Sequence, residues 1–409
     1  MARREHTQHN QIDKRKYASA SAGRKEKPTE AGRRNDHARA ERSAAPKRGG
    51  NRASGEGRRA GERAQTERTP VAWTASGTAA HDWALPVAVT VETEAQLAEV
   101  LKHDAVALVY LDEACFTDFA ALIRRVHAAG KQVGLRLRRI ERDFDANGRK
   151  AENSAELLSG LWKEACDAQT TGVPECSAEE CEAQSVSSAD RGSAAAAEAG
   201  SQMSASGKQL PSCLPDVLLV RNLDEAMLLE DIFGAHPELG ARIRRNFDYT
   251  VYGYNQEAIQ ALVSLGADGF TYPIELTYHE CRKLREKLQS LGLGELPFEL
   301  MIYGHLPMMV SANCIQRTSA RCDHGNRILQ LRDRMGKDMP VRCYCTYCYN
   351  QIFNAEPLVL YDLPDEVRAL QPQCLRYDFS VEPAAVVRQV LEGAVPRSMT
   401  RGHFRHGIE

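Results

Sequence analysis

Three features of the sequence predict an α/β fold that is closed into a (β/α)8 barrel. Eight short strand-like segments, most of them apolar runs, recur between Pro86 and Phe379. All but the seventh are followed directly by a stretch with the apolar spacing of an amphipathic helix. Strands that alternate with helices are parallel and right-handed in their crossovers, and eight such units are what a TIM-type barrel requires. An open, doubly wound sheet is the alternative.

The strands and helices follow one another in a regular order. Thr93 is a suitable N-cap for the first helix, in which Leu97, Val100 and Leu101 would form the buried face. Gly130 would end the second helix. The predicted strands are 86–91, 105–111, 132–138, 216–222, 241–248, 268–273, 298–304 and 373–379, and the predicted helices are 94–103, 116–129, 152–165, 223–233, 256–265, 277–291 and 383–391.

Two segments lack this alternation. Residues 1–78 are rich in Arg, Ala, Gly, Glu and Ser, and a segment with so few large aliphatic residues is expected to be disordered. The tail is basic and would suit an RNA-binding arm, but interspersed acidic residues favour a plain solvated tail. Residues 167–212 predict a disordered insertion in a surface loop. The barrel domain is then expected over 79–396, with 397–409 as a C-terminal tail.

Composition excludes several classes of protein. The 409 residues carry a net charge of -2, so the globular part gives no reason to expect a large basic surface. Twelve cysteines in so long a chain do not indicate a secreted disulfide scaffold. The basic N-terminus lacks the apolar core of a signal peptide, and no run of 18 or more apolar residues predicts a membrane helix. These features predict a cytoplasmic protein without a membrane partner.

The stretch 299–354 holds five of the twelve cysteines. Four of them have the spacing Cys314-x7-Cys322-x22-Cys345-x2-Cys348. Thiolates three residues apart on a tight turn reach one metal centre without backbone strain, so the closing pair is the stronger half of the pattern. The spacing suits an iron–sulphur cluster and a structural zinc ion equally well. Four unrelated thiols are the remaining interpretation, and Cys343 could replace Cys345 or be a bystander.

Active groups of a parallel barrel collect at the carboxyl ends of its strands. This rule selects residues on the fifth to eighth strands. They are Asn246 and Asp248 for the fifth strand, Tyr272, Pro273 and Glu275 for the sixth, Tyr303, Gly304 and His305 for the seventh, and Arg376 and Asp378 for the eighth. The cysteines follow the seventh strand, so they are expected at the same mouth of the barrel.

Each candidate has a chemical role and an ordinary alternative. His305 could be a general acid or base, with Glu299 and Tyr303 as further catalytic candidates. Substrate could be bound by Asn246, Glu275, Arg376 and Asp378, although Glu275 could instead cap the helix after it. Arg376 and Asp378 share one strand face and could form an ion pair, or the arginine could hold an anionic group. The chain lacks a G-x-S-x-G, an H-E-x-x-H and a P-loop motif.

The cysteine region resembles that of the collagenase-like peptidase family U-32. The shared pattern comprises Tyr303-Gly304 with Met308, Cys314 and Cys322, Asp333-Arg334, Pro340-Val341, and the segment from Cys345 to Asn350. The resemblance continues in LRYDFSVE (375–382) and, upstream, in Asn246 to Tyr249, Tyr254-Asn255 and PIELT (273–277). It covers about residues 80–395 and is dense after residue 240.

The resemblance implies a barrel-like fold and two functions, and a third hypothesis comes from another class of protein. In the first, the four cysteines hold a 4Fe-4S cluster in an enzyme that hydroxylates RNA bases or quinone precursors without molecular oxygen. The second is a peptidase, a hydrolase that acts on collagen-like or other proteins. The third is a non-catalytic, zinc-stabilised domain that binds RNA or a partner protein. The chain lacks the L-x-A-P-A-G-like turn with which family members open, so activity could need a missing N-terminal part or a partner chain.

Overall fold

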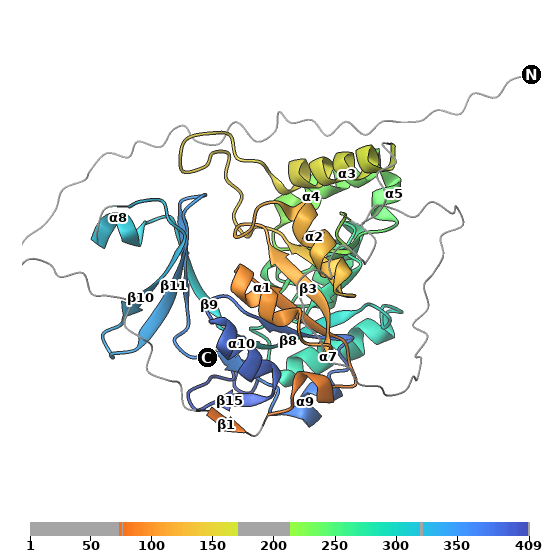
Figure 1. Ribbon diagram of the computed structural model, residues 1–409. Coiled ribbons are helices and arrows are strands. Elements are labelled where there is room, and N and C mark those ends of the chain that lie inside the picture. The colour runs from red at the N-terminus through yellow and green to blue at the C-terminus, as the bar shows by residue number, and fades with distance from the viewer. Residues whose placement is uncertain (1–72, 76, 171–212, 320–321, 408–409) are drawn as a thin grey trace, which may run out of the picture. The chain divides into compact units, whose positions relative to one another are not determined.

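A computed structural model describes residues 73–75, 77–170, 213–319 and 322–407 and shows a closed barrel of eight parallel strands (Figure 1). Each strand pairs with the next along the chain, from β2 to β8, and β14 joins β8 to β2. The predicted (β/α)8 barrel is therefore confirmed, and the open sheet is excluded. The barrel strands are β2 (Val87–Val91), β3 (Val106–Asp112), β4 (Gln132–Arg136), β5 (Val217–Val220), β6 (Arg244–Phe247), β7 (Gly269–Thr271), β8 (Phe298–Gly304) and β14 (Cys374–Asp378).

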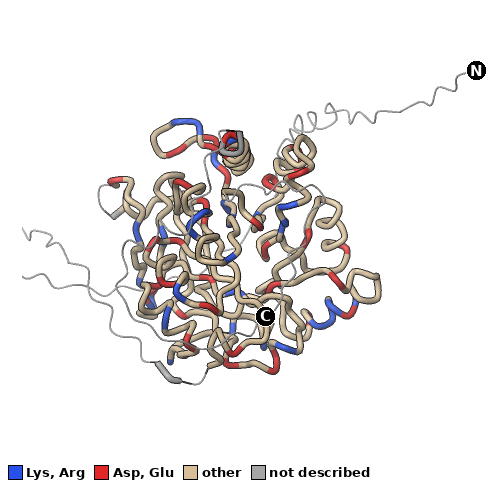
Figure 2. The backbone as a smooth tube through the Cα atoms, turned by 45° about the vertical axis from the view of Figure 1, so that its right-hand side comes forward, with Lys and Arg blue, Asp and Glu red and all other residues tan. Residues whose placement is uncertain are grey.

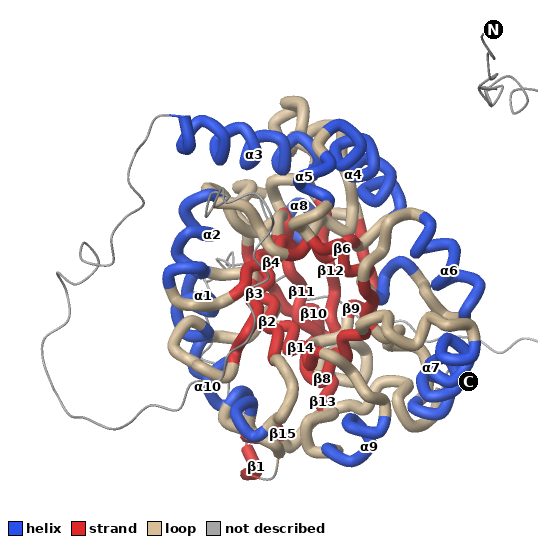
Figure 3. The backbone as a smooth tube through the Cα atoms, turned by 90° about the vertical axis from the view of Figure 1, so that its right-hand side faces the viewer, coloured by secondary structure: helices blue, strands red, loops and turns tan. Residues whose placement is uncertain are grey.

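Helices surround the barrel, as Figure 3 shows in a view along its axis. They are α1 (Glu94–Val100), α2 (Phe119–Ala128), α3 (Ser154–Thr170), α4 (Leu223–Ala235), α5 (Pro237–Gly240), α6 (Gln256–Ser264), α7 (Tyr278–Ser290), α9 (Pro364–Ala369) and α10 (Ala384–Leu391), with 3-10 turns η1 (Ala80–Asp82) and η3 (Tyr249–Val251). Thr93 caps α1 through Gln96, as predicted, and Leu97 and Val100 are buried below it. Thr277 caps α7 with Glu280 in a capping box, so Glu275 is not the cap.

A second sheet replaces the helix that is missing after β8. Its four antiparallel strands are β9 (Pro307–Ser311), β10 (Arg327–Arg332), β11 (Asp338–Tyr344) and β12 (Tyr349–Phe353), in the order β10-β11-β12-β9, and α8 (Ile315–Ser319) lies between β9 and β10. The cysteine region thus forms a sheet of its own (Figure 1). The following segment 357–362 contributes only β13 (Leu358–Val359), which is antiparallel to β8.

The ends of the domain lie further out than the sequence predicts. Trp73–Ala75 form β1, which pairs with β15 (Ala394–Pro396), so the expected tail 1–78 already contains a strand of the domain. The expected C-terminal tail 397–409 also packs on the domain, because Phe404 is buried. The remaining residues of the predicted tail, 1–72 and 76, and the predicted insertion from residue 171 onward lie outside the described residues.

Most apolar burial lies between the barrel and its helices. One large cluster joins the outer strand faces to the helices, whereas the inside of the barrel holds a small cluster of Ala88, Leu108, Tyr110, Val217 and Leu219. Basic and acidic positions are interspersed along the described chain (Figure 2). Many of the buried charged residues lie on the barrel strands or directly after them, and they form the candidate site.

Among the described residues, no helix combines the length and the apolar character needed to cross a bilayer.

Candidate functional site at the carboxyl end of the barrel

Five charged side chains at the carboxyl ends of β2–β6 form a series of alternating charges. Arg136 Nη1 lies 3.3 Å from Glu92 Oε1 and 3.4 Å from Asp112 Oδ2. Arg221 continues the series, with Nη1 3.6 Å from Asp112 Oδ2 and Nε 3.7 Å from Asp248 Oδ2. All five side chains are buried. Buried charges are tolerated only when they are paired, so removing any member leaves its neighbours uncompensated.

Arg376 on β14 ties this series to the middle of the barrel. Its Nη2 lies 2.7 Å from Asp248 Oδ1, its Nη1 3.2 Å from Glu299 Oε2, and its Nε 2.9 Å from Asp378 Oδ1. Its Nη1 also donates to Thr271 Oγ1 at 3.0 Å. The predicted ion pair of Arg376 and Asp378 is therefore present. Because Arg376 is fully buried and surrounded by acceptors of its own chain, it is poorly placed to hold an anionic ligand.

The second sheet closes over this end of the barrel through β11. Arg342 Nε lies 3.2 Å from Glu92 Oε2, and the Tyr344 hydroxyl donates to Glu92 Oε1 at 3.1 Å. The rings of Tyr344 and Tyr349 stack with centroids 4.7 Å apart. Burial raises the pKa of Glu92 to about 7, although Arg342 and Arg136 oppose the shift. A carboxyl group with this pKa can both accept and donate a proton near neutral pH.

A second buried carboxyl group follows the neighbouring strand β3. Glu113 follows β3, with Oε1 3.0 Å from Arg138 Nε, and it accepts a hydrogen bond of 2.7 Å from Ser154 Oγ. Burial raises the pKa of Glu113 to about 7, against the opposing effect of Arg138. The ring of Tyr347, in the turn between β11 and β12, lies 4.5 Å from the Arg138 guanidinium carbon. The site thus contains two proton-accepting groups that are both covered by the cysteine sheet.

The four predicted metal-ligating cysteines come together in space. One small hollow is lined by Cys314, Cys322, His324, Cys345, Cys348, Tyr349 and Asn350. The backbone N–H of Arg317 points at Cys314 Sγ from 3.4 Å, and Gln316 Nε2 points at Cys345 Sγ from 3.5 Å. Such donors stabilise thiolates that bind metal. Cys348 has a φ of 52°, in the tight turn that brings it back toward Cys345.

Strand alternation places the thiols and the barrel carboxylates on opposite faces of β11. Arg342 and Tyr344 face Glu92, so Cys343 and Cys345 face the other way. Burial and neighbouring thiols raise the pKa of Cys345 to about 12. Tyr349 connects the two faces, because it lines the hollow and also stacks on Tyr344. Cys343 is buried but is not among the residues that line the hollow.

Four thiols around one hollow fit the chemistry of an iron–sulphur cluster or a zinc ion, both of which take thiolate ligands. Within the described part of the chain, no three His, Cys, Asp or Glu side chains form a ready-made site for a single metal ion. The structure therefore brings the four predicted ligands together around one hollow.

The predicted catalytic residues are spread over different surroundings. His305 follows β8, with Nδ1 2.8 Å from the Asn354 carbonyl and Nε2 3.7 Å from Glu382 Oε1. The Asn354 contact orients the ring, and Nε2 then faces a buried carboxylate. Tyr303 points instead to the outer side of the barrel, where its ring lies 5.3 Å from that of Phe379.

Three predicted site residues lie away from this mouth or at its rim. Glu275 lies after β7, and burial raises its pKa while His403 lowers it. Asn246 and Glu299 line a cavity at the amino ends of the strands, the opposite end of the barrel. The alternation along a strand identifies residues that face inward but not their depth, which explains why Asn246 was expected at the mouth.

The carboxyl ends of the first four strands also carry charged residues, which were not among the predicted site residues. Glu92, Asp112, Glu113, Arg136 and Arg221 all end or directly follow one of those strands. In the sequence, VTVE and VYLDE show an apolar run that ends on acidic residues. This signal would have found both carboxyl groups whose pKa is raised to about 7.

Neither a protein-family model nor a curated protein matches the sequence. Among solved structures, one similar chain is described as a fructose-1,6-biphosphate aldolase from Coccidioides immitis, with 11% identity and a TM-score of 0.29 over 53% of this chain and 64% of that one. Another is the C-terminal domain of a protein described as a chitinase from Desulfitobacterium hafniense, with 9% identity and a TM-score of 0.31 over 75% of this chain and 97% of that one. The matched region thus spans less than two thirds of the aldolase chain. At these scores, neither likeness bears on function.

Proposed function

We propose that this chain is a cytoplasmic iron–sulphur enzyme of the oxygen-independent hydroxylase type, acting on an RNA base or on a small aromatic or quinone precursor. The observation that carries the proposal is the convergence of Cys314, Cys322, Cys345 and Cys348 on one hollow, in a sheet that covers the mouth of the barrel. The reaction class and the substrate classes come from the resemblance to U-32 proteins, several of which carry such a cluster.

A bound cluster would supply electron transfer, and the chain's own residues would handle protons. Glu92 and Glu113 have pKa values raised to about 7, so each can take a proton from a substrate hydroxyl or from water and return it. Tyr344 donates to Glu92 and thereby fixes the orientation of this carboxyl group. The stacked rings of Tyr344 and Tyr349 form the wall between Glu92 and the thiols.

Unpartnered donors at the mouth favour a substrate with carbonyl oxygens. Among the described residues, Arg221 Nη2, Arg136 Nε and Arg138 Nη1 are buried without a hydrogen-bond partner. Such donors are rare in folded proteins and require an acceptor, from a ligand or from water. Nucleobases and quinones carry acceptors of this kind on flat rings that can pack against tyrosine.

The test is an anaerobic purification followed by iron, sulphide and zinc analysis and an absorption spectrum. We expect a brown protein with about four irons per chain, and loss of colour in both Cys345→Ser and Cys348→Ser. Cys166→Ser on α3 is the matched control and should keep the cluster. Absence of iron under anaerobic handling would overturn the proposal.

The same preparation distinguishes this proposal from the structural zinc site and from the peptidase. One zinc per chain without colour would favour a structural site, because four thiolates are the usual ligands of structural zinc. Proteolysis that survives in Cys345→Ser would favour a peptidase. If iron is found, the substrate search should compare RNA with quinone precursors, and Glu92→Gln should lower the rate of hydroxylation without removing iron.

A further inference from the structure

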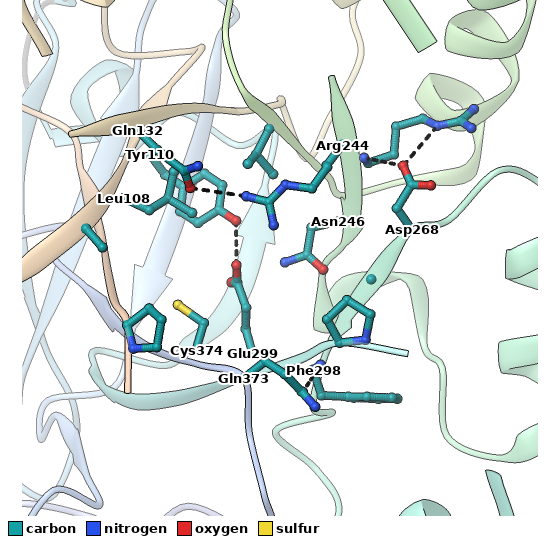
Figure 4. Close-up of a pocket in the computed structure, with 16 residues that line it drawn as sticks. Leu108, Tyr110, Gln132, Arg244, Asn246, Asp268, Phe298, Glu299, Gln373 and Cys374 are labelled. Carbon is teal, nitrogen blue, oxygen red and sulfur yellow. Dashed lines mark hydrogen bonds and ion pairs between the residues drawn. The ribbon is translucent and has the colours of Figure 1, made fainter. Parts of the chain in front are cut away.

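A cavity of about 150 Å³ opens at the amino ends of the barrel strands (Figure 4). The first residues of several strands line it, including Val217 of β5, Phe298 of β8 and Cys374 of β14. It therefore lies at the opposite end of the barrel from the cysteine sheet, which follows the carboxyl end of β8. An apolar cavity of about 150 Å³ can hold one benzene-sized molecule.

Two hydrogen-bond donors face this cavity from β6. Asn246 is 7% exposed, and among the described residues its Nδ2 finds no acceptor. Its Oδ1 lies against Gly269, where a Cβ atom would come within 3.0 Å, so the amide is held with its nitrogen toward the cavity (Figure 4). Arg244 donates from Nη2 to Gln132 Oε1 at 3.2 Å, which holds the guanidinium at the cavity edge. A guanidinium has five N–H donors, so others remain for a ligand.

The acidic groups of the cavity wall are already engaged. The Tyr110 hydroxyl donates to Glu299 Oε1 at 2.6 Å, and Arg376 Nη1 lies 3.2 Å from Glu299 Oε2. Asp268 Oδ2 accepts a hydrogen bond of 2.8 Å from the backbone N–H of Arg245. These carboxyl groups are turned to partners within the protein, whereas Asn246 Nδ2 is left for a ligand.

Apolar side chains complete the wall. Leu108, Val217 and Pro297 line the cavity beside the donors. A ligand that fits must therefore combine one hydrogen-bond-accepting, anionic end with an apolar body of limited size. A dicarboxylate would place its second charge against this apolar wall or near Glu299, and both positions are unfavourable.

We propose that this cavity is a separate small-molecule site for a compact monocarboxylate whose apolar body is about the size of one ring. The carboxylate accepts hydrogen bonds from Arg244 and Asn246, and the body packs on Leu108 and Val217. Glu299 belongs to the cavity wall and is paired with Arg376, which also holds Asp248 and Asp378. An occupant thus touches the ion-pair network that extends to the candidate site. The proposal requires neither a cluster nor any activity there.

The experiment is isothermal titration calorimetry of the full-length protein with benzoate and, in parallel, with the neutral isostere benzamide. Arg244→Gln removes the cation at an exposed position, so the fold should be retained. Val217→Phe fills the cavity from its apolar side. Arg125→Gln, an exposed arginine of α2 that is paired with Glu94, is the matched control.

We expect saturable benzoate binding that weakens at least about tenfold in Arg244→Gln and is lost in Val217→Phe, while Arg125→Gln binds as the wild type does. Benzamide should be bound more weakly than benzoate and should change little in Arg244→Gln. Equal benzoate affinity in the wild type and Arg244→Gln would overturn the proposal. So would the absence of binding by benzoate, cyclohexanecarboxylate and isovalerate at about 10 mM, a concentration that detects even millimolar affinity.

Discussion

At the scale of single residues, the unusual feature of this barrel is the charge in its interior. The inward positions of such barrels are normally filled by layers of branched apolar side chains. Here Arg136, Arg221 and Arg376 are buried among carboxylates, and the apolar cluster inside the barrel is small. Buried ion pairs contribute little net stability compared with well-packed apolar side chains. Their presence at the carboxyl end therefore favours a role in binding or proton transfer.

The raised pKa of Glu92 predicts a pH dependence of stability. Its pKa rises from 4.5 to about 7 in the fold, because burial disfavours the charged form. Between these two values the folded chain retains a proton that the unfolded chain has released. The free energy of unfolding should therefore fall as pH rises from 4.5 to about 7, by about 1–3 kcal/mol for this group. Urea unfolding at several pH values in this window measures the slope.

The variant Glu92→Gln isolates this effect. It cannot ionise, so its unfolding free energy should vary less with pH over the same window, even though the loss of the ion pairs with Arg342 and Arg136 lowers overall stability. Glu113, whose pKa is also raised to about 7, should retain its share of the slope. Glu164→Gln on the exposed side of α3 is the control. An unchanged slope in Glu92→Gln would contradict the assignment.

Among single substitutions, we expect replacement of Arg376 to cause the largest loss of stability. It is fully buried and lies within 3.2 Å of carboxylate oxygens of Asp248, Glu299 and Asp378. The variant Arg376→Met keeps much of the volume but leaves these carboxylates without their cation, which should cost about 3–5 kcal/mol. Chemical unfolding measures the loss. A cost below about 1 kcal/mol would show that the carboxylates are protonated or hydrated in the fold.

At the scale of elements, local sequence pattern predicted the barrel well and the second sheet not at all. Most barrel strands are buried on both faces and therefore appear in the sequence as short apolar runs, whereas β6 reads RRNF and begins at the exposed Arg244. The strands β9 and β10 are largely exposed, and β10 reads RILQLR, in which polar and apolar residues are mixed. Such strands are defined by antiparallel pairing with distant segments, which the sequence of one segment does not reveal. The cysteine spacing gave the only indication that this region is ordered.

The junction of β8 and β14 depends on one glycine. Gly304 has a φ of 153°, and a Cβ atom there would lie 2.9 Å from the Asp378 carbonyl oxygen. The close approach of Gly304 to the Asp378 backbone holds Asp378 beside Arg376. It also sets the direction in which the chain leaves β8 toward His305. Gly304→Ala should therefore destabilise the protein by about 1–3 kcal/mol, measured by thermal and urea unfolding. Gly160→Ala in α3 meets no atom within 4 Å and should stabilise slightly. Similar effects of the two substitutions would contradict this account.

At the scale of the whole molecule, the sequence predicted which cysteines meet but not the depth of the inward-facing residues. The four cysteines line one hollow because β11, β12 and α8 fold over the mouth, a result that their spacing anticipated. Asn246 and Glu299 were expected with the same site and lie at the opposite end of the barrel. The periodicity of a strand shows which face of the sheet a side chain is on. Its position along the barrel axis depends instead on the register in which the strand pairs with its neighbours. The register of eight strands is a property of the closed barrel.

The C-terminal segment 397–409 was expected to be a tail. Its packing in the structure indicates that it is part of the domain. Phe404 is buried with its ring 5.8 Å from that of Tyr278, and its carbonyl accepts a hydrogen bond of 2.7 Å from the Tyr278 backbone N–H at the start of α7. Arg401 forms an ion pair with Asp362. Phe404→Ala should lower the free energy of unfolding by about 2–4 kcal/mol, since it removes a buried ring near the surface.

The exposed neighbour His406 supplies the control, and His406→Ala should leave stability within about 0.5 kcal/mol of the wild type. Deletion of residues 397–409 should cost at least as much as Phe404→Ala, because it also removes the ion pair of Arg401 with Asp362. Thermal unfolding of the three variants decides between a docked segment and a tail. If the deletion unfolds at the same temperature as the wild type, residues 397–409 contribute nothing to the barrel, and the domain ends at β15 as the sequence predicted.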